Sequence, residues 1–235
     1  MRISEIYVSK QGEGRLTEAP SVFIRTSGCN LRCDFCDTPF ASWNPEGSNF
    51  STSEIVEQAL TLAEASPLED VRHAVITGGE PMLSKEIVLL TEELKAAGFH
   101  ITIETAGTID QKVSCDLMSI SPKMSNSTPT KERAGEWSEK HERDRRRPDI
   151  VSELISRFDY QLKFVVADPT DIDEILAYLN DLEDFDRAKV LLMPEGVTQS
   201  ELKDREPWLL PLCETNGFQF CPRMHIEWYG NKRGT

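Results

Sequence analysis

Long apolar runs are missing from this sequence of 235 residues. No stretch approaches the roughly 20 consecutive apolar residues of a membrane-spanning helix, and the first residues, Met1-Arg-Ile-Ser-Glu5, lack the apolar core of a secretory signal. Hydrophobic residues still make up 39% of the chain and charged residues 28%, a composition typical of a folded globular protein. We therefore expect a cytoplasmic protein without membrane association.

Positive charge is also scarce, with 26 lysines and arginines against 40 aspartates and glutamates and a net charge of −14. Because sequence-independent binding to nucleic acid depends on Lys and Arg neutralising phosphates, this balance disfavours direct contact with nucleic acid. Basic residues gather only at 131–147, where acidic residues are interleaved with them. We interpret this stretch as part of a polar, solvated insertion over about residues 124–148, with a substrate lid or a partner contact as alternatives.

Cysteines are few and show no pairing pattern that would indicate a disulfide framework. Three of the six are scattered and are expected to pack as apolar residues: Cys115, Cys213 and Cys221. The other three form a single C-x3-C-x2-C run: Cys29, Cys33 and Cys36.

This run supplies only three thiolate ligands. Soft thiolates select zinc, Cu(I) or iron–sulfur clusters, and a structural zinc ion or an ordinary [4Fe–4S] cluster is normally closed by four protein ligands. No further Cys or His follows at short spacing, and the nearest is His73. The run therefore favours a [4Fe–4S] cluster with one iron open to a ligand that is not protein, over a zinc site or three structural thiols.

Strand-like and helix-like segments alternate along the chain. Helices are predicted from Ser51, from Ser84 to Gly98, near 150–157, after Pro169 and across 206–215, and strands at 2–8, 21–26, 74–77, 100–104, 116–120, 161–166, 189–193 and in an extended C-terminal segment. Such alternation argues for a mainly parallel sheet, and about six units are too few for a closed eight-stranded barrel. We predict an α/β fold of one domain, residues 1–235, built as an incomplete, open parallel β/α barrel of about six strands.

The most informative motifs each follow a predicted strand. They are the cysteine run, Thr77-Gly-Gly-Glu-Pro81, Glu104-Thr-Ala-Gly107 and Ser121-Pro-Lys123. Because active sites of such folds gather at the carboxyl ends of the strands, we expect these motifs to share one site.

The cysteine run and the downstream Gly-Gly-Glu-Pro resemble the radical S-adenosylmethionine (SAM) superfamily. More narrowly, the sequence resembles the 7-carboxy-7-deazaguanine synthase family in Gln11-Gly-Glu-Gly14, Phe23-Ile-Arg25, 28–38, Ser121-Pro-Lys123, Gln161-Leu-Lys-Phe164, Pro222-Arg-Met-His225 and 230–234. The cysteine spacing is specific only to the superfamily, whereas the combination of the other motifs narrows the resemblance to this family.

The resemblance implies a lyase of the queuosine and 7-deazapurine pathway, which serves tRNA modification. The three cysteines would bind three irons of a [4Fe–4S] cluster, and SAM would chelate the fourth iron and be cleaved to methionine and a 5′-deoxyadenosyl radical. The radical would abstract hydrogen from 6-carboxy-5,6,7,8-tetrahydropterin, whose ring contracts with loss of ammonia to 7-carboxy-7-deazaguanine. A one-electron donor, flavodoxin-like or ferredoxin-like, and a homodimer are also implied.

Residues for SAM follow from the matching motifs and from their chemistry. Gly78 and Gly79 allow close approach of the backbone to the methionyl end, where a plain turn is the alternative. Glu80 is expected to accept a hydrogen bond from the methionyl ammonium, and Glu104 to pair with ribose hydroxyls unless it serves as a carboxylate at a helix start. The remaining candidates for SAM are Phe35, for which packing of the loop is the alternative, and Asp37, Ser121, Pro122, Lys123 and Gln161.

Binding the carboxylate of a pterin requires a cation, and the planar guanidinium of Arg25 can donate two hydrogen bonds to a carboxylate. Arg25 lies inside a predicted strand, where an unpaired charge is costly. An internal salt bridge is the alternative. Gln11 and Glu13 provide donors and acceptors for the aminopyrimidinone edge. Gly12 permits close backbone contact, Thr77 can touch the substrate, and Lys10 stands where relatives commonly carry a small or apolar residue.

In the family, the threonine after the Cys-Asp pair binds Mg²⁺ together with substrate oxygens, and Thr38 occupies that position here. One hydroxyl suffices because Mg²⁺ keeps waters and takes other oxygen ligands; a turn cap is the alternative. The C-terminal segment, about 218–235, is expected to close the substrate pocket with His225, Lys232 and Arg233. His225 alternates with polar residues as in a strand, so an ordinary histidine is the alternative there.

Two further functions stay open. A radical SAM activase that installs a glycyl radical in a partner protein shares the cysteine run but requires neither Gln11-Gly-Glu-Gly14 nor Arg25. A non-catalytic zinc module requires only the cysteines. Turnover of a pterin without a protein substrate distinguishes the first alternative, and the ratio of iron to zinc distinguishes the second.

Overall fold

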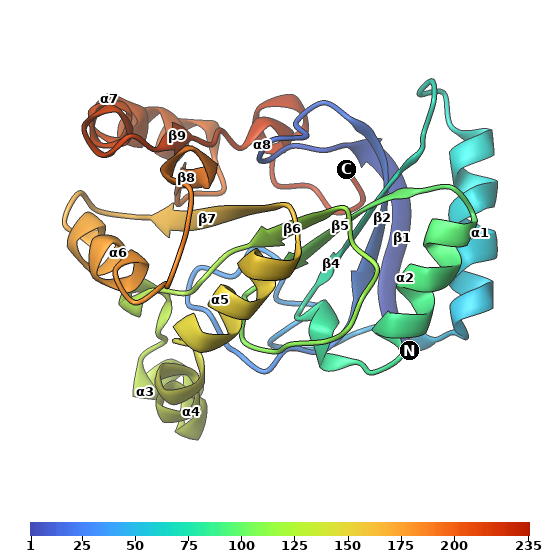
Figure 1. Ribbon diagram of the computed structural model, residues 1–235, viewed down its shortest axis with the longest axis horizontal. Coiled ribbons are helices and arrows are strands. Elements are labelled where there is room, and N and C mark those ends of the chain that lie inside the picture. The colour runs from blue at the N-terminus through green and yellow to red at the C-terminus, as the bar shows by residue number, and fades with distance from the viewer.

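The computed structural model describes residues 1–235, and its strands form a single nine-stranded sheet in the order β3-β1-β2-β4-β5-β6-β7-β8-β9 (Figure 1). The strands are β1 (Arg2–Lys10), β2 (Pro20–Thr26), β3 (Ser48–Asn49), β4 (His73–Gly78), β5 (His100–Thr105), β6 (Leu117–Ile120), β7 (Tyr160–Val166), β8 (Val190–Pro194) and β9 (Gln219–Phe220).

All neighbouring strands from β2 to β9 are parallel, whereas β1 pairs antiparallel with both β2 and β3. The sheet is open, since β3 and β9 are its two edges. The parallel part of the sheet consists of six longer strands, β2 and β4 to β8, and the two-residue edge strand β9. The predicted incomplete barrel of about six strands is therefore confirmed.

The chain contains eight helices, most of which connect parallel strands and lie around the outside of the curved sheet (Figure 1). They are α1 (Thr52–Ala65), α2 (Ile87–Ala96), α3 (Lys131–Ala134), α4 (Glu136–Asp144), α5 (Pro148–Arg157), α6 (Asp171–Leu179), α7 (Gln199–Asn216) and α8 (Met224–Tyr229), with short 3₁₀ turns at Pro81–Leu83, Ser125–Ser127 and Arg187–Lys189. None of the helices combines the length and the apolar character that crossing a lipid bilayer requires.

The main core is a cluster of 36 buried residues between the helices and the sheet, and a second cluster contains three. Every residue of β4 except its final glycine is buried, as are all residues of β6 and β8. Strands buried on both faces are typical of parallel sheets covered by helices. This packing keeps the carboxyl ends of the strands fixed relative to one another.

The two ends of the sheet approach each other through loops rather than through strand pairing. The amide of Met224 donates to the carbonyl of Gly12 at 2.9 Å, and the amide of Gly14 donates to Sγ of Cys221 at 3.2 Å. In Figure 1, α8 accordingly lies beside the loop that follows β1. The gap in the barrel is thus bridged by residues 11–14 and by the C-terminal segment.

The structure differs from the sequence predictions at several elements. The polar stretch 124–148, which shows no periodicity, contains a 3₁₀ turn, α3 and α4. The segment around His225 is the helix α8 and not a strand, because its turn places Met224 against the loop at Gly12. Ser84 does not cap α2, which begins only after Glu86.

Candidate active site

A cavity of about 650 Å³ opens at the carboxyl ends of the parallel strands. Most residues predicted for cluster, cofactor, metal or substrate line it: Lys10, Gln11, Gly12, Glu13, Arg25, Cys29, Cys33, Phe35, Cys36, Asp37, Thr38, Thr77, Gly78, Gly79, Glu104, Ser121, Lys123 and His225. Three predicted residues, Glu80, Pro122 and Gln161, do not line it. The expectation that the motifs share one site agrees with this arrangement.

The loop after β2 carries the three cysteines, all of which are free thiols. Burial raises the pKa of Cys29 and of Cys33 to about 12, so both are protonated without a bound metal. No three side chains among His, Cys, Asp and Glu converge as a single metal ion requires. A cubane cluster does not need that convergence, because each iron takes its own sulfur. The donor set, three thiols facing one cavity, fits such a cluster.

Gly78 and Gly79 hold the end of β4 against the start of the cysteine loop. A Cβ at Gly78, where φ is +134°, would lie 2.2 Å from the carbonyl oxygen of Thr26, and one at Gly79 would lie 2.1 Å from that of Gly28. The amide of Glu80 donates to the same Gly28 carbonyl at 2.9 Å. Only glycine allows this close approach, which places Gly78 against Thr26 and Gly79 against Gly28, the residue before Cys29.

Glu80 is 2% exposed, and its carboxylate faces the end of β5. The carboxylate accepts from the amides of Met82 (3.0 Å) and Ala106 (2.8 Å) and from the hydroxyl of Thr105 (2.8 Å). Burial raises the pKa of Glu80, although these hydrogen bonds oppose the shift. In this structure Glu80 therefore ties the loop after β4 to the loop after β5.

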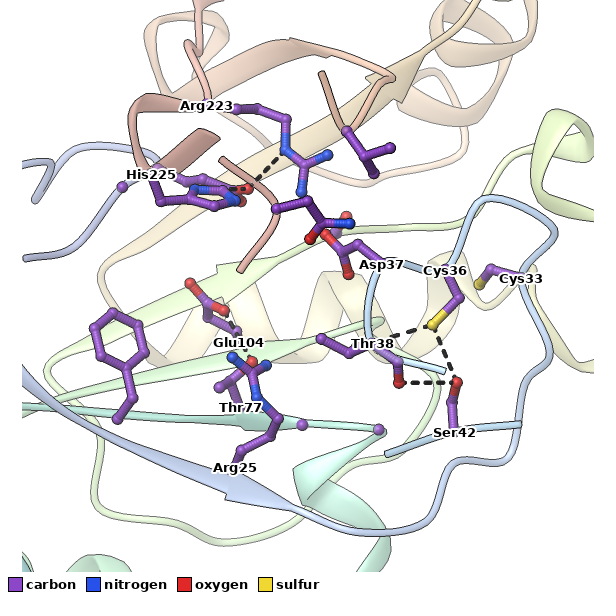
Figure 2. A pocket seen from close by; sticks show the side chains of 18 of the residues that line it. Arg25, Cys33, Cys36, Asp37, Thr38, Ser42, Thr77, Glu104, Arg223 and His225 are labelled. Carbon is purple, nitrogen blue, oxygen red and sulfur yellow. Dashed lines mark hydrogen bonds and ion pairs between the residues drawn. The ribbon is translucent and has the colours of Figure 1, made fainter. Parts of the chain in front are cut away.

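Thr38 and Ser42 lie next to the third cysteine. Sγ of Cys36 is 3.0 Å from Oγ of Ser42 and 3.8 Å from Oγ1 of Thr38. Figure 2 shows Thr38 between Cys36 and the group formed by Arg25, Thr77 and Glu104. Its hydroxyl therefore lies between the thiols and the polar side of the cavity.

Arg25 lines the cavity and is also paired within the protein. Its Nε donates to Glu5 at 2.7 Å, and its Nη2 donates to the hydroxyl of Tyr7 at 2.9 Å. Burial would lower the pKa of Arg25, but Tyr7 and Glu5 outweigh it and raise that pKa. The salt bridge that was the alternative interpretation is present. Its geometry leaves Nη1 without a protein hydrogen-bond partner, so the pairing and a substrate role are compatible.

Glu104 connects residues predicted for the substrate rather than standing alone. Its carboxylate accepts from the hydroxyl of Thr77 at 2.9 Å and from Nε2 of Gln11 at 3.1 Å. β4, β5 and the loop after β1 thus meet at one hydrogen-bonded group. This contact orients the side-chain oxygen of Gln11, which accepts from the amide of Glu13 at 3.2 Å.

A buried ion network forms another wall of the cavity. Glu13 pairs with Lys163, with Nε of Arg223 at 3.1 Å and with Nδ1 of His225 at 3.8 Å, while Arg223 also pairs with Asp37 (Figure 2). Burial would raise the pKa of Glu13, but Lys163 and Arg223 outweigh it and hold that pKa far below its usual range. Two carboxylates and two cations therefore stay charged and balanced. Glu13, Lys163 and Arg223 are largely shielded from water, whereas Asp37 is 38% exposed.

Lys163 and Arg223 were not selected from the sequence as site residues. Both side chains are only 6% exposed. The sequence did contain an indication for Lys163, because it is a charged residue within the apolar strand Tyr160–Val166, as Arg25 is within its own strand. Such a position requires a partner, and the partner is Glu13.

Gln161, the weakest SAM candidate, is hydrogen-bonded to the loop after β1. Its Oε1 accepts from the amide of Arg15 at 2.9 Å, and its Nε2 donates to Ser119 at 2.8 Å. Lys123 instead faces the cavity and donates to the carbonyl and hydroxyl of Ser121 at 2.7 and 2.8 Å. Pro122, between them, is buried.

The C-terminal residues reach the mouth of the cavity, which residues 231–235 help to line. Arg233 pairs with Glu5 at 3.0 Å and with Glu46 at 2.9 Å, and its guanidinium lies 4.0 Å from the ring centroid of Phe40. The same Glu5 holds Arg25. This segment therefore closes the side of the cavity on which Arg25 lies.

Comparison with known proteins agrees with this geometry. The model of the radical SAM superfamily matches residues 23–142. A 7-carboxy-7-deazaguanine synthase of Rhodopirellula baltica is 47% identical over 234 residues, covering 99% of this chain and 88% of that protein. The chain belongs to the 7-carboxy-7-deazaguanine synthase family of radical SAM enzymes.

A second member of this family, from Halobacterium salinarum, is 43% identical, covering 95% of this chain and 88% of that protein. Among solved structures, QueE from Escherichia coli superposes with a TM-score of 0.66 at 24% identity over 94% of this chain and 92% of that one. A structure of TYW1 gives a TM-score of 0.60 at 12% identity, covering 85% and 74%. These two structures support the fold. The identities to named synthases do not favour the activase alternative.

Proposed function

We propose that this protein converts 6-carboxy-5,6,7,8-tetrahydropterin to 7-carboxy-7-deazaguanine with loss of ammonia. The observation that carries the proposal is that the three cysteines share one cavity with Arg25, Gln11, Glu13 and Thr38, in a member of the synthase family. A protein that only bound metal would have no need of the polar residues on the other side of that cavity.

Cys29, Cys33 and Cys36 are proposed to hold a [4Fe–4S] cluster, leaving one iron for SAM. When bound, this pair supplies the 5′-deoxyadenosyl radical on transfer of one electron. Because burial raises the pKa of the Cys29 and Cys33 thiols, taking up the cluster must release protons from them. Cluster assembly is therefore expected to be favoured by higher pH.

The SAM site is proposed to lie where the cysteine loop meets the ends of β4, β5 and β6. Gly78 and Gly79 offer backbone groups at the start of the cysteine loop, and Ser121 and Lys123 offer a hydroxyl and a cation for the carboxylate of methionine. Phe35 and Asp37 line the same cavity. Glu80 is proposed to hold the edge of this site, through Thr105 and Ala106, in keeping with its buried carboxylate.

The pterin is proposed to lie against Arg25, Gln11, Glu13, Thr77 and His225. The guanidinium of Arg25 attracts the pterin carboxylate, and the charged Glu13 accepts hydrogen bonds from the aminopyrimidinone edge. Burial lowers the pKa of His225, although Glu13 opposes the shift. The ring is therefore neutral near pH 7 and offers one donor and one acceptor. Lys10 borders the same region, with its ammonium 5.7 Å from the ring centroid of Trp228.

Thr38 is proposed to bind Mg²⁺ together with substrate oxygens and water. Its hydroxyl lies at the cavity wall between the thiols and the substrate residues (Figure 2). A hydroxyl is a suitable ligand, because Mg²⁺ prefers oxygen and retains waters. The metal would draw substrate oxygens toward the thiol side of the cavity.

We propose that the protein is cytoplasmic, forms a homodimer and receives single electrons from a flavodoxin-like or ferredoxin-like donor. The net charge of −14 supports the absence of direct contact with nucleic acid. The product is proposed to enter queuosine or 7-deazapurine synthesis as a free small molecule.

The test is anaerobic incubation of reconstituted protein with SAM, reductant, Mg²⁺ and carboxytetrahydropterin, followed by mass analysis of the product. We expect 7-carboxy-7-deazaguanine and 5′-deoxyadenosine, and neither when the pterin is replaced by buffer alone, apart from slow uncoupled cleavage of SAM. Cleavage of SAM without any change in the pterin would contradict the proposed substrate.

A further inference from the structure

The segment between β6 and α5 packs against the cysteine loop from outside the cavity. In Figure 1 its helices α3 and α4 stand apart from the helices that surround the sheet. Two backbone amides of the loop, on either side of Cys33, donate to this segment. The amide of Arg32 donates to Nδ1 of His141 at 3.1 Å, and the amide of Asp34 donates to the carbonyl of Ser127 at 2.8 Å.

His141 and Ser127 join these two contacts into one unit. The hydroxyl of Ser127 donates to the carbonyl of Met124 at 2.6 Å, so it accepts from Nε2 of His141, 3.0 Å away. The imidazole is thus the neutral tautomer with the proton on Nε2, which leaves Nδ1 free to accept from Arg32. His141 has no exposed surface and Ser127 has none, so the bond between them is buried, and the bond to the Arg32 amide is shielded from water on the side of the histidine.

The unit is anchored to the body of the protein. Arg145, 5% exposed, donates to the carbonyl of Lys123 at 3.1 Å and pairs with Glu142 and Glu174. Lys123 itself lines the cavity. The segment is therefore held at the end of β6 and at α6.

A second, more exposed layer covers the same loop. The guanidinium of Arg32 lies 3.9 Å from the ring centroid of Trp137 and donates to the carbonyls of Cys29 and Leu31 at 2.9 and 2.8 Å. Lys140 donates to the carbonyl of Asn30 at 3.2 Å. All four residues from 29 to 32 thus have a backbone group in these contacts: Arg32 of the loop holds the carbonyls of Cys29 and Leu31, and the segment holds the carbonyl of Asn30 and the amide of Arg32. Because His141 has no exposed surface whereas Trp137 and Lys140 are partly exposed, the contact through His141 is the better shielded from water.

We propose that His141 is a positioning residue for the cysteine loop: it fixes the backbone at Arg32 and so holds Cys33 in place for the cluster before the cluster is present. This inference rests on the proposed function only in that the ligand taken up by the loop is an iron–sulfur cluster. The physical basis is that a buried amide without a partner is costly, so the loop keeps the one conformation that satisfies it.

The experiment compares wild type with His141→Leu and His141→Asn. Leu removes both hydrogen bonds, whereas the Oδ1 of Asn lies near the position of Nδ1 and can accept from the Arg32 amide. His100→Asn is the matched control, because His100 is exposed on β5. Hydrogen–deuterium exchange of the cluster-free protein is measured over residues 30–36, and the rate of iron loss to a chelator is measured on the loaded protein, together with the electron paramagnetic resonance (EPR) spectrum of the reduced cluster.

In His141→Leu we expect exchange over 30–36 and iron loss to be roughly tenfold faster, the effect of losing the hydrogen bond to the Arg32 amide, which is the bond that Asn can replace. His141→Asn should restore both rates and the EPR line shape, and the control should match wild type. Wild-type rates in the Leu variant would overturn the proposal, as would a failure of Asn to restore them. If the Leu variant does not fold, Ser127→Ala removes the partner of Nε2 together with the hydrogen bond to the carbonyl of Met124, and it must also accelerate exchange and iron loss or the proposal fails. Because exchange is measured without cluster, SAM or pterin, its outcome is independent of the reaction catalysed.

Discussion

Arg25 and Lys163 are charged residues inside otherwise buried strands, and both face the cavity. The sequence alone singled out Arg25, because an unpaired charge in a strand is costly. The same reasoning applies to Lys163, but its partner Glu13 lies 150 residues away. Pairing over such a separation cannot be read from local spacing.

Arg25→Ala should raise the KM for the pterin far more than the KM for SAM. Loss of a charged hydrogen-bonded contact corresponds to about 1.5–3 kcal/mol, or roughly 10- to 100-fold in KM. The removal also leaves Glu5 with only Arg233 as its cation. Equal effects on both KM values in steady-state kinetics would contradict a substrate-specific role. The double variant Arg25→Ala/Glu5→Gln is the control, because it also removes the charge of the Glu5 carboxylate that has lost one of its two cations.

Thr38→Ala should weaken the response of turnover to Mg²⁺ while iron content and the cluster spectrum stay unchanged. The hydroxyl is the proposed protein ligand, and Thr38→Ser keeps it, so the serine variant should titrate with Mg²⁺ as wild type does. The measurement is turnover against Mg²⁺ concentration. A titration that is the same in the alanine variant and in wild type would remove Thr38 from the metal site.

At the scale of elements, the sequence predicted the strands well because their apolar runs are short and bounded by turns. Residues 2–8 and 161–166, for example, fall within β1 and β7. The start of α7 was misplaced. The predicted helix across 206–215 begins too late, since α7 begins at Gln199 and contains both Pro207 and Pro211. Thr198 and Glu201 form a capping box there, a local signal that outweighs the prolines.

Other elements depend on contacts that local patterns do not reveal. The helices α3 and α4 are polar on most sides and are fixed by the cysteine loop and by Arg145. The helix α8 is fixed by the carbonyl of Gly12, more than 200 residues earlier in the chain. Short elements of this kind obtain their stability from tertiary packing rather than from propensity.

The capping box at the start of α7 offers a prediction about stability. Thr198→Ala should lower the free energy of unfolding by about 1 kcal/mol, because the hydroxyl accepts from the amide of Glu201 at 3.3 Å. Thr170→Ala is the matched control, since Thr170 stands at the start of α6 without a side-chain capping bond. Equal losses for the two variants in urea titrations would rule out a specific contribution of the cap.

Across the whole molecule, buried histidines couple folding to pH. His73 bonds Ser21 and Thr102 at 2.7 Å each across three strands. Burial, and to a lesser degree His100, lowers the pKa of His73 to about 4. Burial does the same for His141, whose pKa is also about 4. The unfolded chain takes up these protons near pH 6.5, whereas the folded protein does so only near pH 4.

Stability should therefore be full above pH 6.5 and fall as the pH decreases toward 4. Each of these histidines should remove about 1 kcal/mol of unfolding free energy between pH 7.5 and 5.5. Urea titrations of the cluster-free protein at both pH values measure the change, and His73→Gln should reduce it. A pH dependence that is identical in this variant would contradict the assignment.

The central claim at this scale is that the folded chain supplies three sulfurs to an iron–sulfur cluster and leaves one iron to SAM. Its most direct test is the EPR spectrum of the reduced, anaerobically reconstituted protein, recorded with and without SAM, with Cys33→Ala as control. We expect about four irons per chain, a spectrum that changes when SAM is added, and neither property in the variant. An EPR spectrum of the cluster that does not change when SAM is added, or zinc bound in place of iron, would contradict the account.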